Sequence, residues 1–239
     1  MRKFMLLAVA SLAAVLGVVG IASAVNPEQS LIVKTTNTKA GSPAKPKSVG
    51  KLNVETPTKP AEGEAGTFAT KTAVISFDKN IVFGASKFPT CSLTQVEKDE
   101  TKCKTGSKVG SGSATAVFSG QTINLTVKAY NGNAKGTKIY LLVQNSQFGI
   151  NKALDGTLGK ALPPYGKRLT VKIPANLQQP VAGAYATLTD FKTSVGGTHN
   201  GTPYAALKGC TGGKLRYKGV FNYSDGTSKT ATTTSKCSK

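Results

Sequence analysis

Strict alternation of apolar and polar side chains is the feature that most restricts how this chain can fold. Between residues 121 and 130, apolar side chains occupy every second position, and threonine, asparagine and lysine fill most of the others. Successive side chains of a β-strand point to opposite faces of the sheet, so this period of two predicts a half-buried strand. The same alternation predicts strands at residues 169–173 and 215–223, and the aromatic side chains of the latter should point into the core.

A continuous apolar run at residues 139–143 predicts a central strand that is covered on both faces. Asn131-Gly132-Asn133 and Ser224-Asp225-Gly226-Thr227 are turn sequences that should each join two neighbouring strands as a hairpin. One segment, residues 92–98, has the pattern of a helix, because Ser92 followed by Gln95 resembles a capping box. The sequence therefore predicts an all-β fold, an antiparallel β-sandwich of Ig-like or jelly-roll type with about ten strands and one short helix.

The first 24 residues resemble a secretory signal peptide. Arg2 and Lys3 supply a positive start, an apolar run covers residues 4–21, and Ala22-Ser23-Ala24 is the pattern after which signal peptidase cleaves. A retained N-terminal membrane anchor is the alternative, since the apolar run approaches membrane-spanning length. We expect cleavage, no transmembrane segment in the remaining chain, and a secreted protein that is extracellular or bound to the cell wall.

Residues 25–239 are long enough to form a single β-sandwich domain. Lysine, proline, threonine and alanine are abundant near residues 38–48 and 57–67, which predicts two mobile loops. Apolar positions at residues 31–33 and 52–54 predict two early strands around the first of these loops.

The four cysteines after the predicted signal peptide indicate disulfide bonds, because an even number in an exported chain is typical of them. Four cysteines allow three pairings, and we favour the one between sequence neighbours, Cys91 with Cys103 and Cys210 with Cys237. Each bond would contribute about 3 kcal/mol if it formed without strain. A metal site is the alternative, but the chain has no C-x-x-C motif and one histidine, so we predict no metal and no cofactor.

Positive charge dominates the composition. Without Arg2 and Lys3 the chain has 29 basic and 11 acidic residues, a net charge of +18, and only Arg168 and Arg216 among the basic residues are arginines. Lysine is a hydrated point charge, whereas arginine makes the bidentate contacts that recognise phosphate and guanine. Lysines spread along the chain thus predict diffuse attraction to an anionic cell-wall polymer or lipid surface, and disfavour sequence-specific nucleic-acid binding. Solubility alone explains the charge equally well.

Patterns of catalytic residues are weak in this sequence. His199 lies in a glycine-rich loop, and the chain has neither a G-x-S-x-G motif nor a pair of carboxylates with an obvious shared cleft. The glycine-rich segment 106–112 lacks the Lys-Ser/Thr ending of a phosphate-binding loop and is better explained as a bulged strand start. We therefore predict no catalytic residue. The loop at Tyr165, with Lys167 and Arg168, is our candidate for a contact surface.

The surroundings of the cysteines resemble a group of known proteins. Phe88-Pro89-Thr90-Cys91, the stretch from Cys103 to residue 112, and residues 223–227 between the last two cysteines are similar to uncharacterised exported β-sandwich proteins of high-GC Gram-positive bacteria. Lys104 departs from that pattern, since those proteins often have proline there. The resemblance implies β architecture and pairing of neighbouring cysteines, and it implies no activity.

Three functional hypotheses follow. The leading one is an exported, non-enzymatic protein that associates with the cell envelope through its lysines. The second is an exported hydrolase with an unfamiliar site near His199. The third is a structural or adhesive module that binds a protein, not identified by the sequence, along an exposed strand edge.

Overall fold

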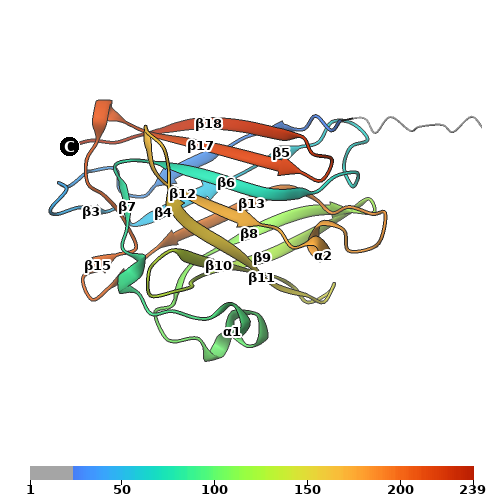
Figure 1. Cartoon of the computed structure of the whole chain (residues 1–239), viewed down its shortest axis with the longest axis horizontal. Coiled ribbons are helices and arrows are strands. Elements are labelled where there is room, and N and C mark those ends of the chain that lie inside the picture. The colour runs from blue at the N-terminus through green and yellow to red at the C-terminus, as the bar shows by residue number, and fades with distance from the viewer. Residues whose placement is uncertain (1–23) are drawn as a thin grey trace, which may run out of the picture.

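The computed structural model describes residues 24–239, and most of its regular structure is antiparallel β-sheet (Figure 1). Strand accounts for 54% of residues 24–239 and helix for 9%, which confirms the all-β prediction. The predicted signal peptide, apart from Ala24, lies outside the described residues. None of the helices within residues 24–239 is long and apolar enough to cross a membrane.

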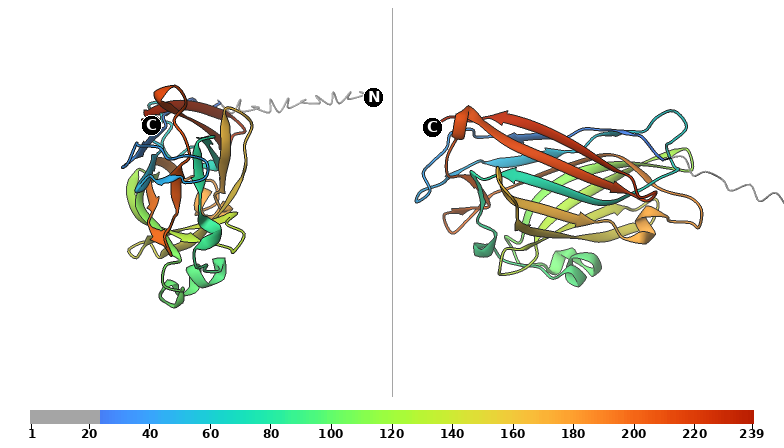
Figure 2. Two further views of the ribbon diagram at one scale, coloured as in Figure 1. Left: turned by 90° about the vertical axis from the view of Figure 1, so that its left-hand side faces the viewer. Right: turned by 45° about the horizontal axis from the view of Figure 1, so that its top comes forward.

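Eleven strands form one continuous sheet. Their spatial order is β18 (Ser228–Lys236), β17 (Lys214–Tyr223), β6 (Thr70–Asp78), β12 (Tyr165–Lys172), β11 (Ile150–Lys160), β10 (Lys138–Asn145), β9 (Gln121–Asn131), β8 (Lys108–Phe118), β13 (Thr187–Gly196), β4 (Lys51–Glu55) and β2 (Ile32–Thr35). The sheet curls until its edge strands β18 and β2 lie close together. Opposite halves of the sheet therefore face each other across one core, as the end view in Figure 2 shows.

Short elements complete the fold around this sheet. The helices are α1 (Leu93–Lys98) and α2 (Ala175–Gln178), and 3₁₀ turns lie at Ala85–Lys87, Glu100–Lys102 and Thr211–Gly213. The short strands are β1 (Glu28–Gln29), β3 (Lys47–Ser48), β5 (Thr58–Lys59), β7 (Ile81–Phe83), β14 (Thr198–His199), β15 (Thr202–Pro203) and β16 (Ala205–Leu207). Strands β3 and β5 lie inside the two segments predicted to be mobile loops, and each pairs with a neighbouring strand.

The strands predicted from alternation are present. Residues 121–130 lie in β9, residues 215–223 lie in β17, and the early segments at 31–33 and 52–54 contribute to β2 and β4. The β17 residues Tyr217, Phe221 and Tyr223 are at most 3% exposed, so their shared face is core. Strand β10 is covered on both faces, because Leu142 packs beneath Val96 of α1 on the outer side.

The glycine-rich segment 106–112 forms the beginning of β8, with a register shift between Lys108 and Gly110. Glycine is needed there because β13 approaches closely, and a Cβ atom on Gly112 would overlap the carbonyl oxygen of Lys192. This confirms the interpretation as a bulged strand start. Another local prediction was wrong: Tyr165, Lys167 and Arg168 are not in a loop.

Those three residues form the start of β12, and only residues 161–164 connect it to β11. Pairing with β6 on one side and β11 on the other explains the strand, since Arg168 lies opposite Ser76 and Gly159. A bulge between Tyr165 and Lys167 interrupts the ladder with β6. The predicted contact surface is therefore part of the sheet.

Both disulfides join sequence neighbours, as predicted. The Cα atoms are 5.2 Å apart in Cys91–Cys103 and 5.7 Å apart in Cys210–Cys237. The first bond closes an excursion, residues 91–103, which contains α1, and the Ser92 hydroxyl caps that helix by accepting from the Gln95 backbone N–H at 3.2 Å. The second bond joins Cys210, which precedes the 3₁₀ turn before β17, to Cys237, which directly follows β18.

Candidate functional site

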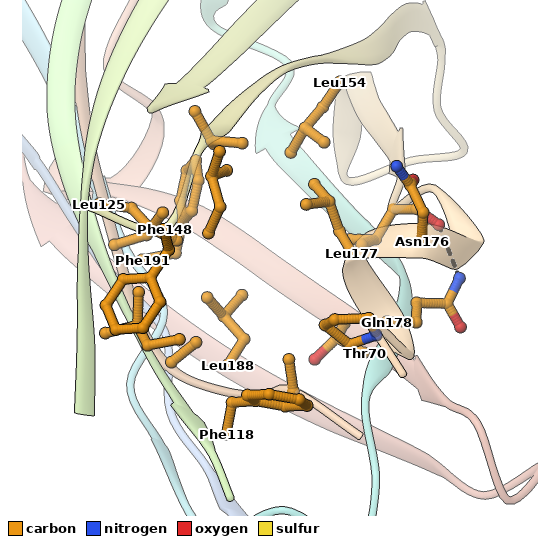
Figure 3. A pocket seen from close by; sticks show the side chains of 18 residues that line it. Thr70, Phe118, Leu125, Phe148, Leu154, Asn176, Leu177, Gln178, Leu188 and Phe191 are labelled. Carbon is orange, nitrogen blue, oxygen red and sulfur yellow. Dashed lines mark hydrogen bonds between the residues drawn. The ribbon is translucent and has the colours of Figure 1, made fainter. Parts of the chain in front are cut away.

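An apolar cavity of about 280 Å³ lies inside the curled sheet, at the end of the molecule that carries α2 (Figure 3). We call this end the cavity end. Its walls come from strands β8, β9, β10, β11 and β13, from α2, and from the turn that contains Phe148. A concave, mostly apolar site with a few polar groups is the usual form of a small-molecule site.

Small side chains on β8 keep the cavity open. Ala114 and Ala116 point inward from this strand, where the neighbouring β9 presents the larger Ile123 and Leu125. The cavity is thus a consequence of alternation with small residues at two inward positions. Sequence analysis did not identify it, because alanine in an alternating segment looks like ordinary core.

Polar groups among the lining residues are few and uncharged. They are Thr70 at the start of β6 and the amide side chains of Asn176 and Gln178 on α2. Gln178 donates from Nε2 to the carbonyl oxygen of Ile173 at 2.6 Å, and this bond fixes the helix against the end of β12. Of the described residues, no Asp, Glu, Lys, Arg or His lines the cavity.

Charge is divided between the two ends of the molecule. Antiparallel strands place their connections alternately at two ends, and Figure 1 shows α2 at one end and β3, β15 and the C-terminus at the other. The connections at the cavity end, residues 56–69, 119–120, 146–149, 173–186 and 224–227, contain one basic residue, Lys59, which forms an ion pair with Glu28 at 3.9 Å. Their other charged residues are acidic, namely Glu62, Glu64 and Asp225.

The opposite end, which we call the lysine end, has the reverse composition. Its connections, residues 36–50, 79–80, 132–137, 161–164, 197–213 and 237–239, contain no acidic residue. Other basic residues lie on the strands and in the 84–107 connection, which has both signs of charge. The lysines of the lysine-end connections are Lys39, Lys45, Lys47, Lys79, Lys135, Lys208 and Lys239.

Five of these lysines form one patch, because backbone hydrogen bonds hold their segments together. The N–H of Ala40 donates to Ser238 at 2.8 Å, the N–H of Gly41 donates to Leu207 at 3.0 Å, and β3 pairs with β16. None of the five forms an ion pair within residues 24–239. We call this group the lysine patch: Lys39, Lys45, Lys47, Lys208 and Lys239.

Two carboxylates of the excursion, Glu97 and Glu100, stabilise the fold through contacts with the sheet. Glu97 of the excursion pairs with Lys152 at 2.6 Å, and Glu100 accepts from Lys128 and the Tyr130 hydroxyl. Burial alone would raise the pKa of Glu100, but these two hydrogen bonds, together with the positive charges of Lys128 and Lys108, outweigh it and hold the pKa below its usual value. They thereby fasten the excursion to the outer face of the sheet.

Buried Asp78 has a similar structural role in the core. It accepts from the backbone N–H groups of Asn80 at 2.9 Å and Arg216 at 3.0 Å. Within the described residues, no cluster of three His, Cys, Asp or Glu side chains is placed to hold a metal ion.

His199 lies in β14 at the lysine end, with its ring centroid 5.7 Å from that of Phe88. Among residues 24–239 its imidazole makes no hydrogen bond or ion pair. A hydrolytic site of the Ser-His-Asp kind needs an acid to orient the imidazole and a hydroxyl to activate. The structure therefore gives the hydrolase hypothesis no partner at His199 within the described residues.

Comparison with known proteins adds no family: no family profile, no curated protein and no solved structure matches this chain. The cavity and the divided charge are therefore the features of the molecule that bear on its function. The excess of lysine is evident from the sequence, from which we predicted a positive charge spread along the whole chain. The signal that sequence analysis missed is the lack of lysine in residues 144–151 and 173–186, two segments that the fold brings to the same end.

Proposed function

We propose that this protein is an exported, non-enzymatic component of the cell envelope that binds a phosphate-rich anionic surface through its lysine patch. The observation that carries the proposal is the grouping, at one end of an elongated molecule, of five lysines that form no ion pair with any residue from 24 to 239. The cleavage pattern at Ala24 and the two disulfides support export.

The chemistry of the patch favours a surface over a single small anion. Lysine ammonium groups at the ends of flexible side chains make no fixed fork, so they suit many phosphate groups of variable spacing. Each lysine near an anionic membrane surface contributes about 1 kcal/mol, and salt screens the attraction over roughly 8 Å at physiological ionic strength. Several lysines acting together can therefore hold the protein at a surface, whereas one lysine cannot.

The other two hypotheses have less structural support. An adhesive module would need a long free strand edge, but β18 and β2, the edges of the large sheet, lie next to each other. The hydrolase hypothesis lacks an acid or hydroxyl bonded to His199 within the described chain.

Binding to anionic surfaces is tested with two triple variants of equal charge. The first, Lys39→Gln with Lys45→Gln and Lys47→Gln, removes three charges from the patch, and the second, Lys59→Gln with Lys71→Gln and Lys172→Gln, removes three exposed charges elsewhere. Cosedimentation with phosphatidylglycerol-containing vesicles and with a polyglycerol-phosphate polymer distinguishes lipid from wall polymer. The patch variant should bind on the order of 100-fold more weakly, since about 3 kcal/mol is lost.

The control variant should lose less than about fivefold in affinity, because its lysines lie away from the surface and are screened. Binding of the unaltered protein should also decrease steeply as salt is added. Equal losses in the two variants, or binding that is insensitive to salt, would reject the lysine patch as the contact surface.

A further inference from the structure

We infer that the cavity at the α2 end is a binding site for an uncharged hydrocarbon ligand, such as a medium-length alkyl chain. This inference is independent of the anionic-surface proposal, because it concerns the other end of the molecule. Figure 3 shows the side chains from α2 and from the strands converging on one space.

The first argument is the amount of apolar surface that water can reach. Phe148 is 42% exposed, and the cavity residues Phe118, Leu188 and Phe191 are only partly buried. Burying apolar area is worth roughly 25 cal/mol per Å², so a hydrocarbon that covers these side chains gains free energy. A dry cavity of roughly 150 Å³ with similar lining is enough to bind benzene in another protein, and this one is larger.

The second argument concerns the charge of the ligand. A buried carboxylate or phosphate is costly unless a cation or several donors compensate it. Among residues 24–239 no basic side chain lines the cavity, and the one lysine in the connections at this end, Lys59, already forms an ion pair with Glu28. An anionic headgroup inside the cavity would therefore meet no cation from the described lining, whereas an alcohol, amide or plain hydrocarbon would need none.

The third argument concerns the mouth of the cavity. Residues 173–186, which include α2, form its border, and the backbone N–H of Ala186 donates to Gln178 at 2.9 Å to close this segment into a loop. Asn176 and Gln178 place amide groups at the border, where they can meet the polar end of a neutral ligand such as an alcohol. Val181 in the same loop is 59% exposed, which extends the apolar surface outward.

Binding can be measured with the uncharged fluorescent probe N-phenyl-1-naphthylamine and two matched variants of β8. Ala114→Leu adds carbon atoms inside the cavity, whereas Thr115→Leu adds a leucine on the opposite face of the same strand. The unaltered protein should bind the probe saturably at one site. Ala114→Leu should weaken binding at least tenfold and Thr115→Leu by less than twofold, with thermal unfolding confirming that both variants fold.

The charge of the ligand is tested by displacing the probe with 1-octanol and with octanoate at pH 8 and 150 mM salt. Octanol should displace the probe at a concentration at least tenfold lower than octanoate, because the two differ only in the charged end. If the probe does not bind saturably, or if the two β8 variants weaken its binding equally, the cavity is not the binding site. Displacement by octanoate as strong as by octanol would overturn the assignment of a neutral ligand.

Discussion

The two ends of this molecule are enclosed by the same sheet, yet one is filled and the other is hollow. At the lysine end a chain of aromatic rings fills the interior, with Phe77 5.4 Å from Phe83 and Phe88 5.1 Å from Tyr204 between ring centroids. The void remaining beside these rings is about 40 Å³, against about 280 Å³ at the cavity end.

This difference shows that the hollow is not imposed by the fold. A curled sheet of these strands can be packed to high density, since it is so packed at the lysine end. At the cavity end, inward alanines such as Ala114 stand where larger apolar residues would complete the core. Interiors normally exclude such voids, so a cavity bordered by partly exposed apolar side chains indicates a ligand.

The largest expected effect is on stability when an aromatic ring is removed from the filled end. Phe77→Ala should lower the free energy of unfolding by about 4 kcal/mol, because Phe77 is 3% exposed and packs against Phe83 and Tyr217. Phe191→Ala, which shortens a partly exposed cavity residue, should cost only about 1.5 kcal/mol. Chemical denaturation measures both, and equal costs would remove the distinction between filled and hollow ends.

The next largest effect is expected when the disulfide at the lysine end is removed. Replacing Cys210 and Cys237 with serine should cost about 3.5 kcal/mol, as expected for a bond that closes a loop of 27 residues. That bond lies at the lysine end, so binding of N-phenyl-1-naphthylamine under native conditions should be unchanged in the double variant. If probe affinity falls along with stability, the two ends are not independent.

Many secondary-structure elements could be predicted from short stretches of sequence, but the cavity and the lysine patch could not. Alternation at residues 121–130 and 215–223 identified strands, and the capping pattern at Ser92 identified α1, because each signal lies within one element. The cavity and the lysine patch depend on strand order. That order brings Lys208 beside residues 36–50 and places the turn at Phe148 near α2, although these segments are far apart in the sequence.

Periodicity also failed where an element is short or is defined by its neighbours. Helix α2 has only four residues and no hydrophobic repeat, so nothing in its sequence predicted it. The start of β12 contains Gly166 after two prolines, which resembles a loop. These residues form a strand because they pair with β6 and β11, and the sequence of the segment alone does not reveal such pairing.

The smallest predicted effect concerns an acidic residue of the cavity end. Asp225 accepts from the backbone N–H groups of Val25 at 2.9 Å and Thr227 at 3.0 Å. Burial would raise its pKa, but these hydrogen bonds outweigh burial and lower the pKa below 3.8. A lowered pKa in the folded state stabilises the protein above the unfolded-state value, and that stability is lost as pH falls through the folded-state value.

Asp225→Asn should therefore be less stable than the unaltered protein by about 0.5 kcal/mol at pH 7, and the difference should be smaller at about pH 3, below the ordinary carboxyl pKa. Urea denaturation at the two pH values measures the difference. A gap that persists at the lower pH would show that the carboxylate charge is not responsible. Octanol affinity should be the same in both proteins at pH 7, since Asp225 does not line the cavity.

The most direct test of the division between the ends is a methyl NMR titration with 1-octanol in leucine-labelled protein. We predict saturable shifts of the cavity leucines Leu125, Leu154, Leu177 and Leu188, and unchanged signals from Leu52, Leu207 and Leu215 near the lysine end. Shifts spread over both groups, or confined to the second group, would contradict the account of one hollow end and one filled end.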